Sequence, residues 1–152
     1  MLDPTEGNYW IKQLIWYGLG IFLAYSTMIL GNNFLYNNAW IFYIAGVLSL
    51  LLVLFFGIEV NNAKCWFEIP FLGTIQPSEF MKIFLIIILS KLINDFNEKY
   101  LNPTIKEEFK FIIKILILVS IPAILTFIEP DTGAVIIYFV ITITMVFLGG
   151  IR

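Results

Sequence analysis

Four long apolar segments alternate with short polar ones along this chain. They cover residues 13–31, 39–57, 109–128 and 131–150. Each approaches the ~20 residues that an α-helix needs to cross about 30 Å of hydrocarbon. The pattern therefore predicts four transmembrane helices.

A fifth segment, residues 77–94, is less apolar but also fits a span. Pro77 suits the first turn of a helix, where its missing N–H group is not needed. Glu79 favours the positive end of the helix dipole. A helix over this range rises about 27 Å at ~1.5 Å per residue, which is just enough to cross. Lys82 and Lys91 lie towards its ends, where long side chains reach the interface.

The composition agrees with a membrane protein. Hydrophobic residues make up 60% of the chain and charged residues 13%, with a mean hydropathy of +0.91. Soluble domains are nearer half apolar and a quarter charged, so a soluble helical bundle would lack a polar surface. No linker or internal repeat divides the chain. We therefore expect an all-α polytopic membrane protein with about five transmembrane helices, in which residues 1–152 form a single membrane domain.

Charge and residue usage exclude several classes of function. The net charge is −2, and nucleic-acid binding requires clustered lysine and arginine. The single cysteine, Cys65, cannot form an internal disulfide, and the chain has no histidine. We expect neither a metal site nor a cofactor. Asp3 and Glu6 precede the first apolar segment, so residues 13–31 are interpreted as a retained span rather than a signal peptide.

The lysines are distributed unequally between the two sides of the predicted bundle. The region around the loop 95–108, together with the end of the fifth span, carries most of the cations: Lys91, Lys99, Lys106, Lys110, Lys114 and Arg152. The opposite side has only Lys12, Lys64 and Lys82. The positive-inside rule places the loop 95–108 in the cytoplasm. The N-terminus, the segment 58–76 and the turn 129–133 are then expected outside.

Two short motifs combine a proline with an acid at the start of a predicted span. The first comprises Gln76, Pro77, Ser78 and Glu79 with Lys82, and the second Pro130, Asp131 and Gly133. The acids could simply cap helix N-termini. Ionisable groups at the edge of hydrocarbon usually face a polar interior or a partner, however. Glu79 and Lys82 share a helix face, and Lys82 could also reach Asp131, giving a polar cluster near the outer surface.

The outer segment 58–76 is a third candidate. It contains Asn61, Lys64 and Trp66, which could contact the polar headgroup of a substrate. It could equally be an ordinary connecting loop whose aromatic side chains lie on the membrane surface. The residues by themselves do not decide between these interpretations, and they include no nucleophile with a matching base.

Together these motifs resemble the SEDS family (shape, elongation, division and sporulation), which includes RodA, FtsW and SpoVE. The resemblance runs from about Tyr9 to Arg152 and rests on the motif of residues 76–79 followed one hairpin later by that of residues 130–133. It implies a peptidoglycan glycosyltransferase of the bacterial cytoplasmic membrane. Such an enzyme polymerises lipid II, an undecaprenyl-pyrophosphate-linked disaccharide peptide, and works with a class B penicillin-binding protein. The run 129–133 favours RodA over FtsW.

The chain also departs from the family pattern. Asn62 stands where the family usually has glycine, and the family has about twice as many spans. The second half of the family fold has no counterpart here. In the family, that half holds the outer loop with the aspartate that is thought to act as general base. We therefore expect a partial SEDS sequence without a catalytic residue and without polymerase activity of its own.

Two other functions remain open from the sequence. The family has also been proposed to flip lipid-linked precursors, and an ionic cluster would then lie on a polar pathway. Predicted spans one, two and five carry no charge in their interiors, which disfavours such a pathway. Alternatively, the chain could be a non-catalytic remnant that only binds a partner helix, although Gly18 and Gly20 are weak support for such an interface.

Overall fold

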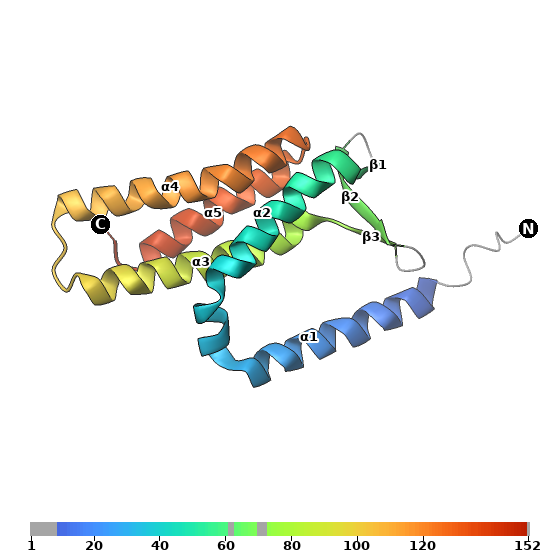
Figure 1. Ribbon diagram of the computed structural model, residues 1–152, viewed down its shortest axis with the longest axis horizontal. Helices are drawn as coiled ribbons and strands as arrows, with labels where there is room; N and C mark the ends of the chain where they lie inside the picture. Colours follow the sequence, from blue (N-terminus) through green and yellow to red (C-terminus); the bar gives the residue numbers. More distant parts are fainter. Residues whose placement is uncertain (1–8, 61–62, 70–72, 152) are drawn as a thin grey trace, which may run out of the picture.

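The computed structural model describes residues 9–60, 63–69 and 73–151. Five helices and three short strands follow one another along the chain: α1 Tyr9–Asn37, α2 Ala39–Phe56, β1 Ile58–Val60, β2 Ala63–Ile69, β3 Gly73–Ile75, α3 Pro77–Lys99, α4 Ile105–Ile128 and α5 Thr132–Leu148. Helices α2 to α5 lie side by side, and the strands lie at one end of this bundle (Figure 1). The prediction of an all-α polytopic membrane protein is confirmed.

The helices differ in how well each would cross a membrane alone. Among the described residues, three are long and apolar enough, namely Trp10–Asn37, α2 and α4. Helix α5 is apolar but shorter, and α3 contains charged side chains. That α3 and α5 also span stays a prediction, which their packing alongside α2 and α4 favours.

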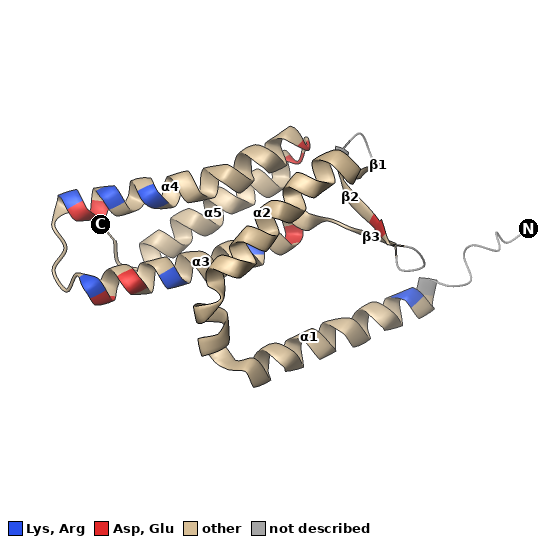
Figure 2. Cartoon of the chain, in the orientation of Figure 1, with Lys and Arg blue, Asp and Glu red and all other residues tan. Residues whose placement is uncertain are grey.

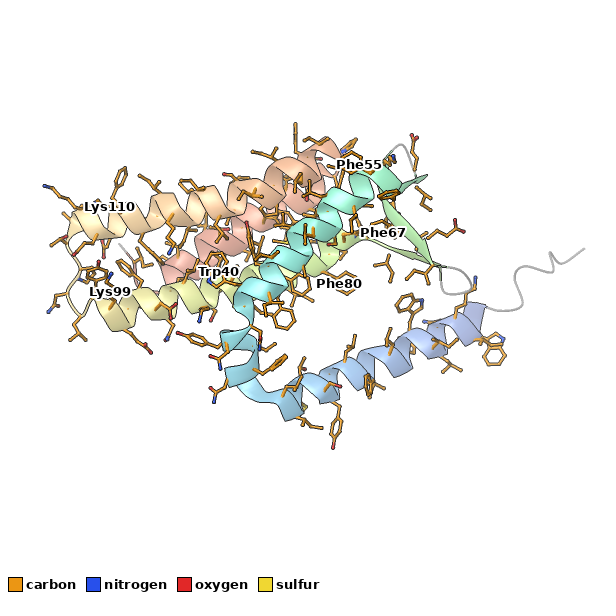
Figure 3. All side chains as sticks on the ribbon, in the orientation of Figure 1. Trp40, Phe55, Phe67, Phe80, Lys99 and Lys110 are labelled. Atoms are coloured by element: carbon orange, nitrogen blue, oxygen red, sulfur yellow. The ribbon has the colours of Figure 1, made fainter. Side chains whose placement is uncertain are left out.

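The core lies between α2, α3, α4 and α5. Each contributes fully buried apolar side chains, among them Leu50, Leu85, Ile115 and Tyr138. The outward faces remain apolar: Phe55, for example, is 73% exposed. Figure 3 shows side chains projecting from every helix of the bundle. An apolar exterior around a packed core fits a protein surrounded by hydrocarbon.

A proline in α4 leaves one backbone group that needs a partner. Pro122 has no N–H, so the carbonyl of Leu118, one turn earlier, is not bonded within the helix. The hydroxyl of Tyr43 on α2 donates to this carbonyl at 2.8 Å. Because hydrocarbon offers no hydrogen bonds, this contact allows α4 to run through the proline while buried against α2.

Helix α1 stands apart from the other four. It bends at Gly31, whose φ of 71° lies outside the helical range and suits glycine. The segment before the bend diverges from the bundle (Figure 1), and none of its most apolar window is buried. Its exposed apolar surface requires cover from lipid or from other protein segments.

The outer segment forms a small sheet that the sequence analysis did not predict. Strand β2 pairs antiparallel with β1 on one side and with β3 on the other. The outer strands have only three residues each, which is too short for an alternating pattern to be recognised. The sheet joins the end of α2 to the start of α3 and thereby sets where Gln76 enters the bundle.

The close approach of α2 and α3 yields a test of this packing. A Cβ atom at Gly46 would lie 2.5 Å from Sδ of Met81 and 2.7 Å from Cδ2 of Phe84. Gly46→Val is therefore expected to lower the free energy of unfolding by about 1–3 kcal/mol, as overpacking does. Unfolding in mixed micelles, followed by circular dichroism, measures this. Gly20→Val is the control, since nothing lies within 4 Å there; equal effects of both would contradict the packing.

Candidate functional site

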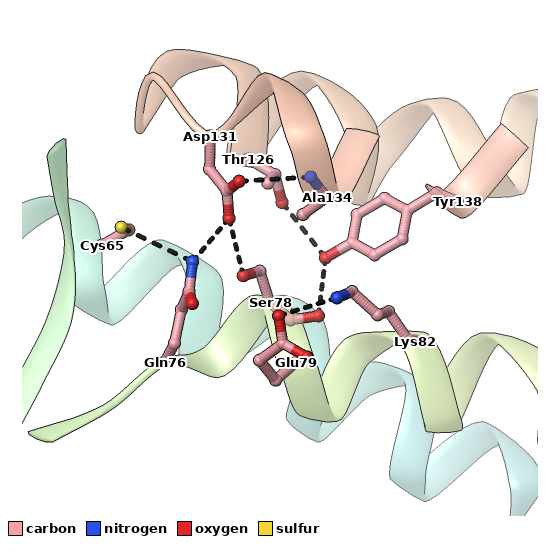
Figure 4. A network of polar contacts seen from close by, with 9 residues as sticks. All are labelled: Cys65, Gln76, Ser78, Glu79, Lys82, Thr126, Asp131, Ala134 and Tyr138. Atoms are coloured by element: carbon pink, nitrogen blue, oxygen red, sulfur yellow. Dashed lines mark hydrogen bonds and ion pairs between the residues drawn. The ribbon is translucent and has the colours of Figure 1, made fainter. Parts of the chain in front are cut away.

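The polar residues of both sequence motifs meet at the sheet end of the bundle. Gln76 is the N-cap of α3, which begins at Pro77, and Asp131 is the N-cap of α5. Hydrogen bonds from Gln76 and Ser78 to Asp131 show that these two helix N-termini lie together. Figure 4 shows the resulting network, with contributions from β2, α3, α4 and α5. We refer to these residues as the outer network: Cys65, Gln76, Ser78, Glu79, Lys82, Thr126, Asp131 and Tyr138.

Asp131 is the centre of the outer network. Its Oδ1 accepts the backbone N–H of Ala134 at 3.1 Å and so caps α5. Its Oδ2 accepts the side-chain amide of Gln76 at 2.6 Å and the hydroxyl of Ser78 at 2.9 Å. One carboxylate therefore fixes the start of α5 against the start of α3.

A second set of bonds lies just below, inside the bundle. The hydroxyl of Tyr138 donates to the carbonyl of Ser78 at 3.1 Å and lies 3.3 Å from Oγ1 of Thr126. All three residues are fully buried. These contacts join α3, α4 and α5 at one level, and the sequence analysis did not single out Thr126 or Tyr138.

Glu79 and Lys82 form a separate ion pair. Nζ of Lys82 donates to Oε1 of Glu79 at 2.7 Å. The Lys82 side chain is 18% exposed and that of Glu79 is 58% exposed. Lys82 thus forms its ion pair within α3, whereas Asp131 accepts hydrogen bonds from neutral groups. The three-way ionic contact that the sequence allowed is not present, because Gln76 and Ser78 occupy the carboxylate of Asp131.

Glu129 is a buried acid that sequence reasoning passed over. It is 1% exposed, and neither carboxyl oxygen has a hydrogen-bond partner among the described residues. Burial, and secondarily the charge of Asp131, raises the pKa of Glu129 to about 8. The group is therefore mostly protonated at neutral pH. Its position directly after an apolar helix was the signal that could have revealed it.

Cys65 lies beside the network on β2. It is 2% exposed, and its Sγ accepts the amide of Gln76 at 3.6 Å. Burial raises the pKa of Cys65, and the charge of Asp131 adds to this effect. A thiol that stays protonated is a poor nucleophile, so Cys65 acts here as a small buried side chain.

The structure places the predicted outer-segment residues in different surroundings. Asn61 lies outside the described residues. Nζ of Lys64 donates to the carbonyl of Phe55 at 3.3 Å, where α2 ends. Trp66 lines a hollow of about 440 Å³ between α1, the sheet and α3, together with Trp16, Gln76 and Glu79. The structure therefore brings Trp66 to the motif of α3 and directs Lys64 away from it.

The remaining motif residues lie at the starts of helices. Pro77 occupies the first turn of α3, as predicted from its type. Gly133 lies in the first turn of α5, where an added Cβ would make only ordinary contact with Asp131. Within residues 9–60, 63–69 and 73–151, no cluster of three acidic or thiol groups could hold a metal ion.

Comparison with known proteins decides the family. The family model described as "Cell cycle protein" (FtsW, RodA and SpoVE) matches residues 3–152. The chain belongs to this family. The resemblance to the SEDS proteins that the sequence motifs carried is thereby confirmed.

Curated relatives of the chain include proteins named FtsW and MrdB. The chain is 30% identical to a probable peptidoglycan glycosyltransferase FtsW of Hydrogenovibrio crunogenus, over 97% of this chain and 36% of the relative. It is 30% identical to the peptidoglycan glycosyltransferase MrdB of Helicobacter pylori, over 93% of this chain and 36% of the relative. The chain thus spans little more than a third of these relatives.

Solved structures of the family have the same fold. The crystal structure of the Thermus thermophilus rod shape determining protein RodA matches with a TM-score of 0.77 and 26% identity, over 99% of this chain and 46% of that one. A chain from a structure described as the structural coordination of polymerization and crosslinking by a peptidoglycan synthase complex also matches. Its TM-score is 0.76 and its identity 28%, over 92% of this chain and 39% of that chain. The preference for RodA over FtsW stays a prediction, since both kinds of relative match.

The role of Asp131 can be tested by removing its carboxylate. Asp131→Ala is expected to lower the free energy of unfolding by about 1–3 kcal/mol, because it leaves the amide of Gln76 and the hydroxyl of Ser78 without their acceptor. Chemical unfolding in mixed micelles measures this. Glu68→Gln, at an exposed acid of β2, is the control and should change nothing. A stable Asp131→Ala protein would contradict the central position of this carboxylate.

The buried carboxyl of Glu129 predicts a pH dependence. Its pKa in the folded state, about 8, lies above the usual 4.5, so the folded protein binds the extra proton. The stability that this proton confers is complete below pH 4.5 and is lost as the pH rises towards 8. Unfolding at pH 5, 6.5 and 8 should show falling stability, and Glu129→Gln should flatten this slope. Equal slopes for both proteins would contradict the assignment.

Proposed function

We propose that this chain forms part of a peptidoglycan glycosyltransferase and binds the lipid-linked disaccharide precursor, lipid II, at its outer end. The relatives named as peptidoglycan glycosyltransferases support this activity for the whole protein. The protein then lies in the bacterial cytoplasmic membrane, with the sheet and the outer network facing outwards. It contributes to cell-wall synthesis, cell shape and division.

The hollow beside the outer network is the observation that carries this proposal. It has two tryptophans, Trp16 and Trp66, next to the carboxylate of Glu79. Aromatic rings pack against the apolar faces of sugar rings, and carboxylates accept hydroxyl hydrogen bonds. Lys82 follows one turn deeper and is bonded to Glu79. A cation at this depth suits the pyrophosphate that links the sugar to its lipid.

The chemical step needs a general base, which neither the outer network nor Glu129 provides. Glu79 is paired with Lys82, Asp131 accepts three hydrogen bonds, and Glu129 is buried and mostly protonated. None of them is an exposed, unengaged base. In the proposed enzyme, residues 76–82 hold the substrate, and the general base comes from the half of the family fold that this chain does not match.

A class B penicillin-binding protein is the partner that the family resemblance implies. The structure of a peptidoglycan synthase complex among the similar structures supports an assembly of this kind. Helix α1, whose most apolar window is unburied, offers one surface for further protein contacts. A protein that only bound a partner helix would not need this hollow or the carboxylate of Glu79 that lines it.

A flippase is the competing function, and the interior of the bundle disfavours it. Between the outer network and the opposite end, the buried side chains of α3 are all apolar: Leu85, Ile88, Leu89, Leu92, Ile93 and Phe96. A polar headgroup crossing the membrane would require polar side chains at this level. The buried hydroxyls of Tyr43 and Thr142 are already bonded to backbone carbonyls, so they do not form a polar pathway.

Lipid II binding gives the test of this function. The chain in nanodiscs is titrated with lipid II, and tryptophan fluorescence reports occupancy of the hollow. Lys82→Met is expected to weaken binding by about tenfold or more, because a charge-assisted hydrogen bond is worth ~1.5–3 kcal/mol. Lys106→Gln, at the opposite end of the bundle, is the control.

Two outcomes would overturn the proposal. Unchanged affinity in Lys82→Met would contradict the binding of lipid II by residues 76–82. Polymer formation by the 152-residue chain alone would contradict the assignment of the base to the other half of the family fold.

A further inference from the structure

A second hollow, of about 410 Å³, lies at the opposite end of the bundle, where α3 ends and α4 begins. Three lysines line it: Lys99 from α3, with Lys110 and Lys114 from α4. Figure 2 shows the cations gathered at this end of the two helices, and Figure 3 shows Lys99 and Lys110 on them. We call this hollow the basic pocket.

None of the three lysines of the basic pocket forms an ion pair within the described ranges. In the described ranges the one ion pair joins Glu79 and Lys82, far from this site. Lys99 lies over the ring of Tyr100, with Nζ 5.1 Å from its centre. The lining of the pocket therefore combines three positive charges with the two acids Asp95 and Glu107.

The two acids of the basic pocket already have other partners. Oε2 of Glu107 accepts the backbone N–H and the hydroxyl of Thr104, both at 2.8 Å, and so caps the start of α4. The hydroxyl of Tyr36 donates to Asp95. These bonds come from neutral donors, so both carboxylates keep their charge, and that of Glu107 interacts with Lys110 and Lys99. With three lysines and two acids, the lining carries a net charge of one positive.

The base of the basic pocket is made of packed aromatic rings. Phe96 and Phe111 stack with ring centres 4.3 Å apart, and each is only 7% exposed. Tyr100 lies against Phe96 at 5.1 Å. A floor of packed rings under a rim of lysines suits a ligand with an anionic head and an apolar body.

The surroundings of the basic pocket favour a lipid over a soluble anion. Leu101 and Ile105, at the two ends of the α3–α4 connection, are 91% and 85% exposed. Such exposure of large apolar side chains beside lysines is typical of segments at the membrane interface. Lys110 and Lys114 lie one turn apart on α4, where their stems can extend towards the headgroups. The lysine distribution places this end in the cytoplasm.

We propose that the basic pocket binds an anionic phospholipid of the cytoplasmic leaflet, of the diphosphate class represented by cardiolipin. Basic pockets between transmembrane helices on the cytoplasmic side bind such headgroups in other membrane proteins. Lys110 and Lys114 contact the phosphates from α4, Lys99 approaches from α3, and the aromatic floor meets the glycerol and acyl groups. This site is independent of lipid II binding at the outer end.

Retention of lipids by the purified chain tests the proposal. Native mass spectrometry of the chain in detergent, with added cardiolipin, phosphatidylglycerol or phosphatidylcholine, measures the bound fraction of each. Cardiolipin is expected to bind most tightly and phosphatidylcholine least. Lys110→Gln should weaken cardiolipin binding about fivefold. Lys106→Gln is the matched control, because it removes the same charge from the same end of α4 outside the pocket, and it should leave binding unchanged.

Several outcomes would overturn the proposal. Equal weakening by Lys106→Gln and Lys110→Gln would indicate diffuse surface charge instead of a site. Full competition by inorganic pyrophosphate would indicate a soluble anion. Binding of an acidic peptide that depends on Lys110, without retention of any lipid, would assign the pocket to a protein partner. Thermal unfolding of each variant, expected to match that of the unmodified chain, separates loss of binding from loss of fold.

Discussion

The carboxylate of Asp131 is the interaction on which the outer end of this protein depends. It ends the turn between α4 and α5, caps α5, and accepts hydrogen bonds from Gln76 and Ser78 at the start of α3. Near hydrocarbon an ionised group must have its bonds met by the protein. Once Asp131 is satisfied in this way, the two helix starts have one relative position, and the sheet that leads into Gln76 is fixed with them.

The same constraint explains the other polar contacts of the bundle. The hydroxyl of Tyr138 closes the layer below Asp131 by bonding Ser78, and that of Tyr43 meets the carbonyl that Pro122 leaves unbonded. Each contact joins two helices, so satisfying a polar group also selects a packing arrangement. Glu129 is the exception among the described residues, and its raised pKa is the consequence: a buried acid without donors is more stable when it is protonated.

The two ends of the bundle have different chemistry because they use their charges differently. At the outer end, Lys82 is bonded to Glu79 and the acid of α5 is bonded to neutral groups, which leaves a defined polar surface next to two tryptophans. At the other end, Glu107 caps α4 and Asp95 accepts a hydrogen bond from the hydroxyl of Tyr36, and the lysines of the basic pocket form no ion pair within the described residues. The apolar layer between them separates the two sites.

The sequence by itself determined the features that depend on near neighbours in the chain. Apolar runs of about twenty residues predict spanning helices, because helix length is proportional to residue number. The pair of Glu79 and Lys82 follows from their spacing of three, and the two motifs were enough to indicate the family. The tertiary structure alone decided the contacts between distant residues. Gln76 and Asp131 are 55 residues apart, and Ser78 and Tyr138 are 60 apart. Strands of three residues carry too little pattern to be seen, and a pocket built from the ends of two helices requires their packing. Local spacing fixes which residues share a helix face, whereas only the assembled bundle fixes which faces meet.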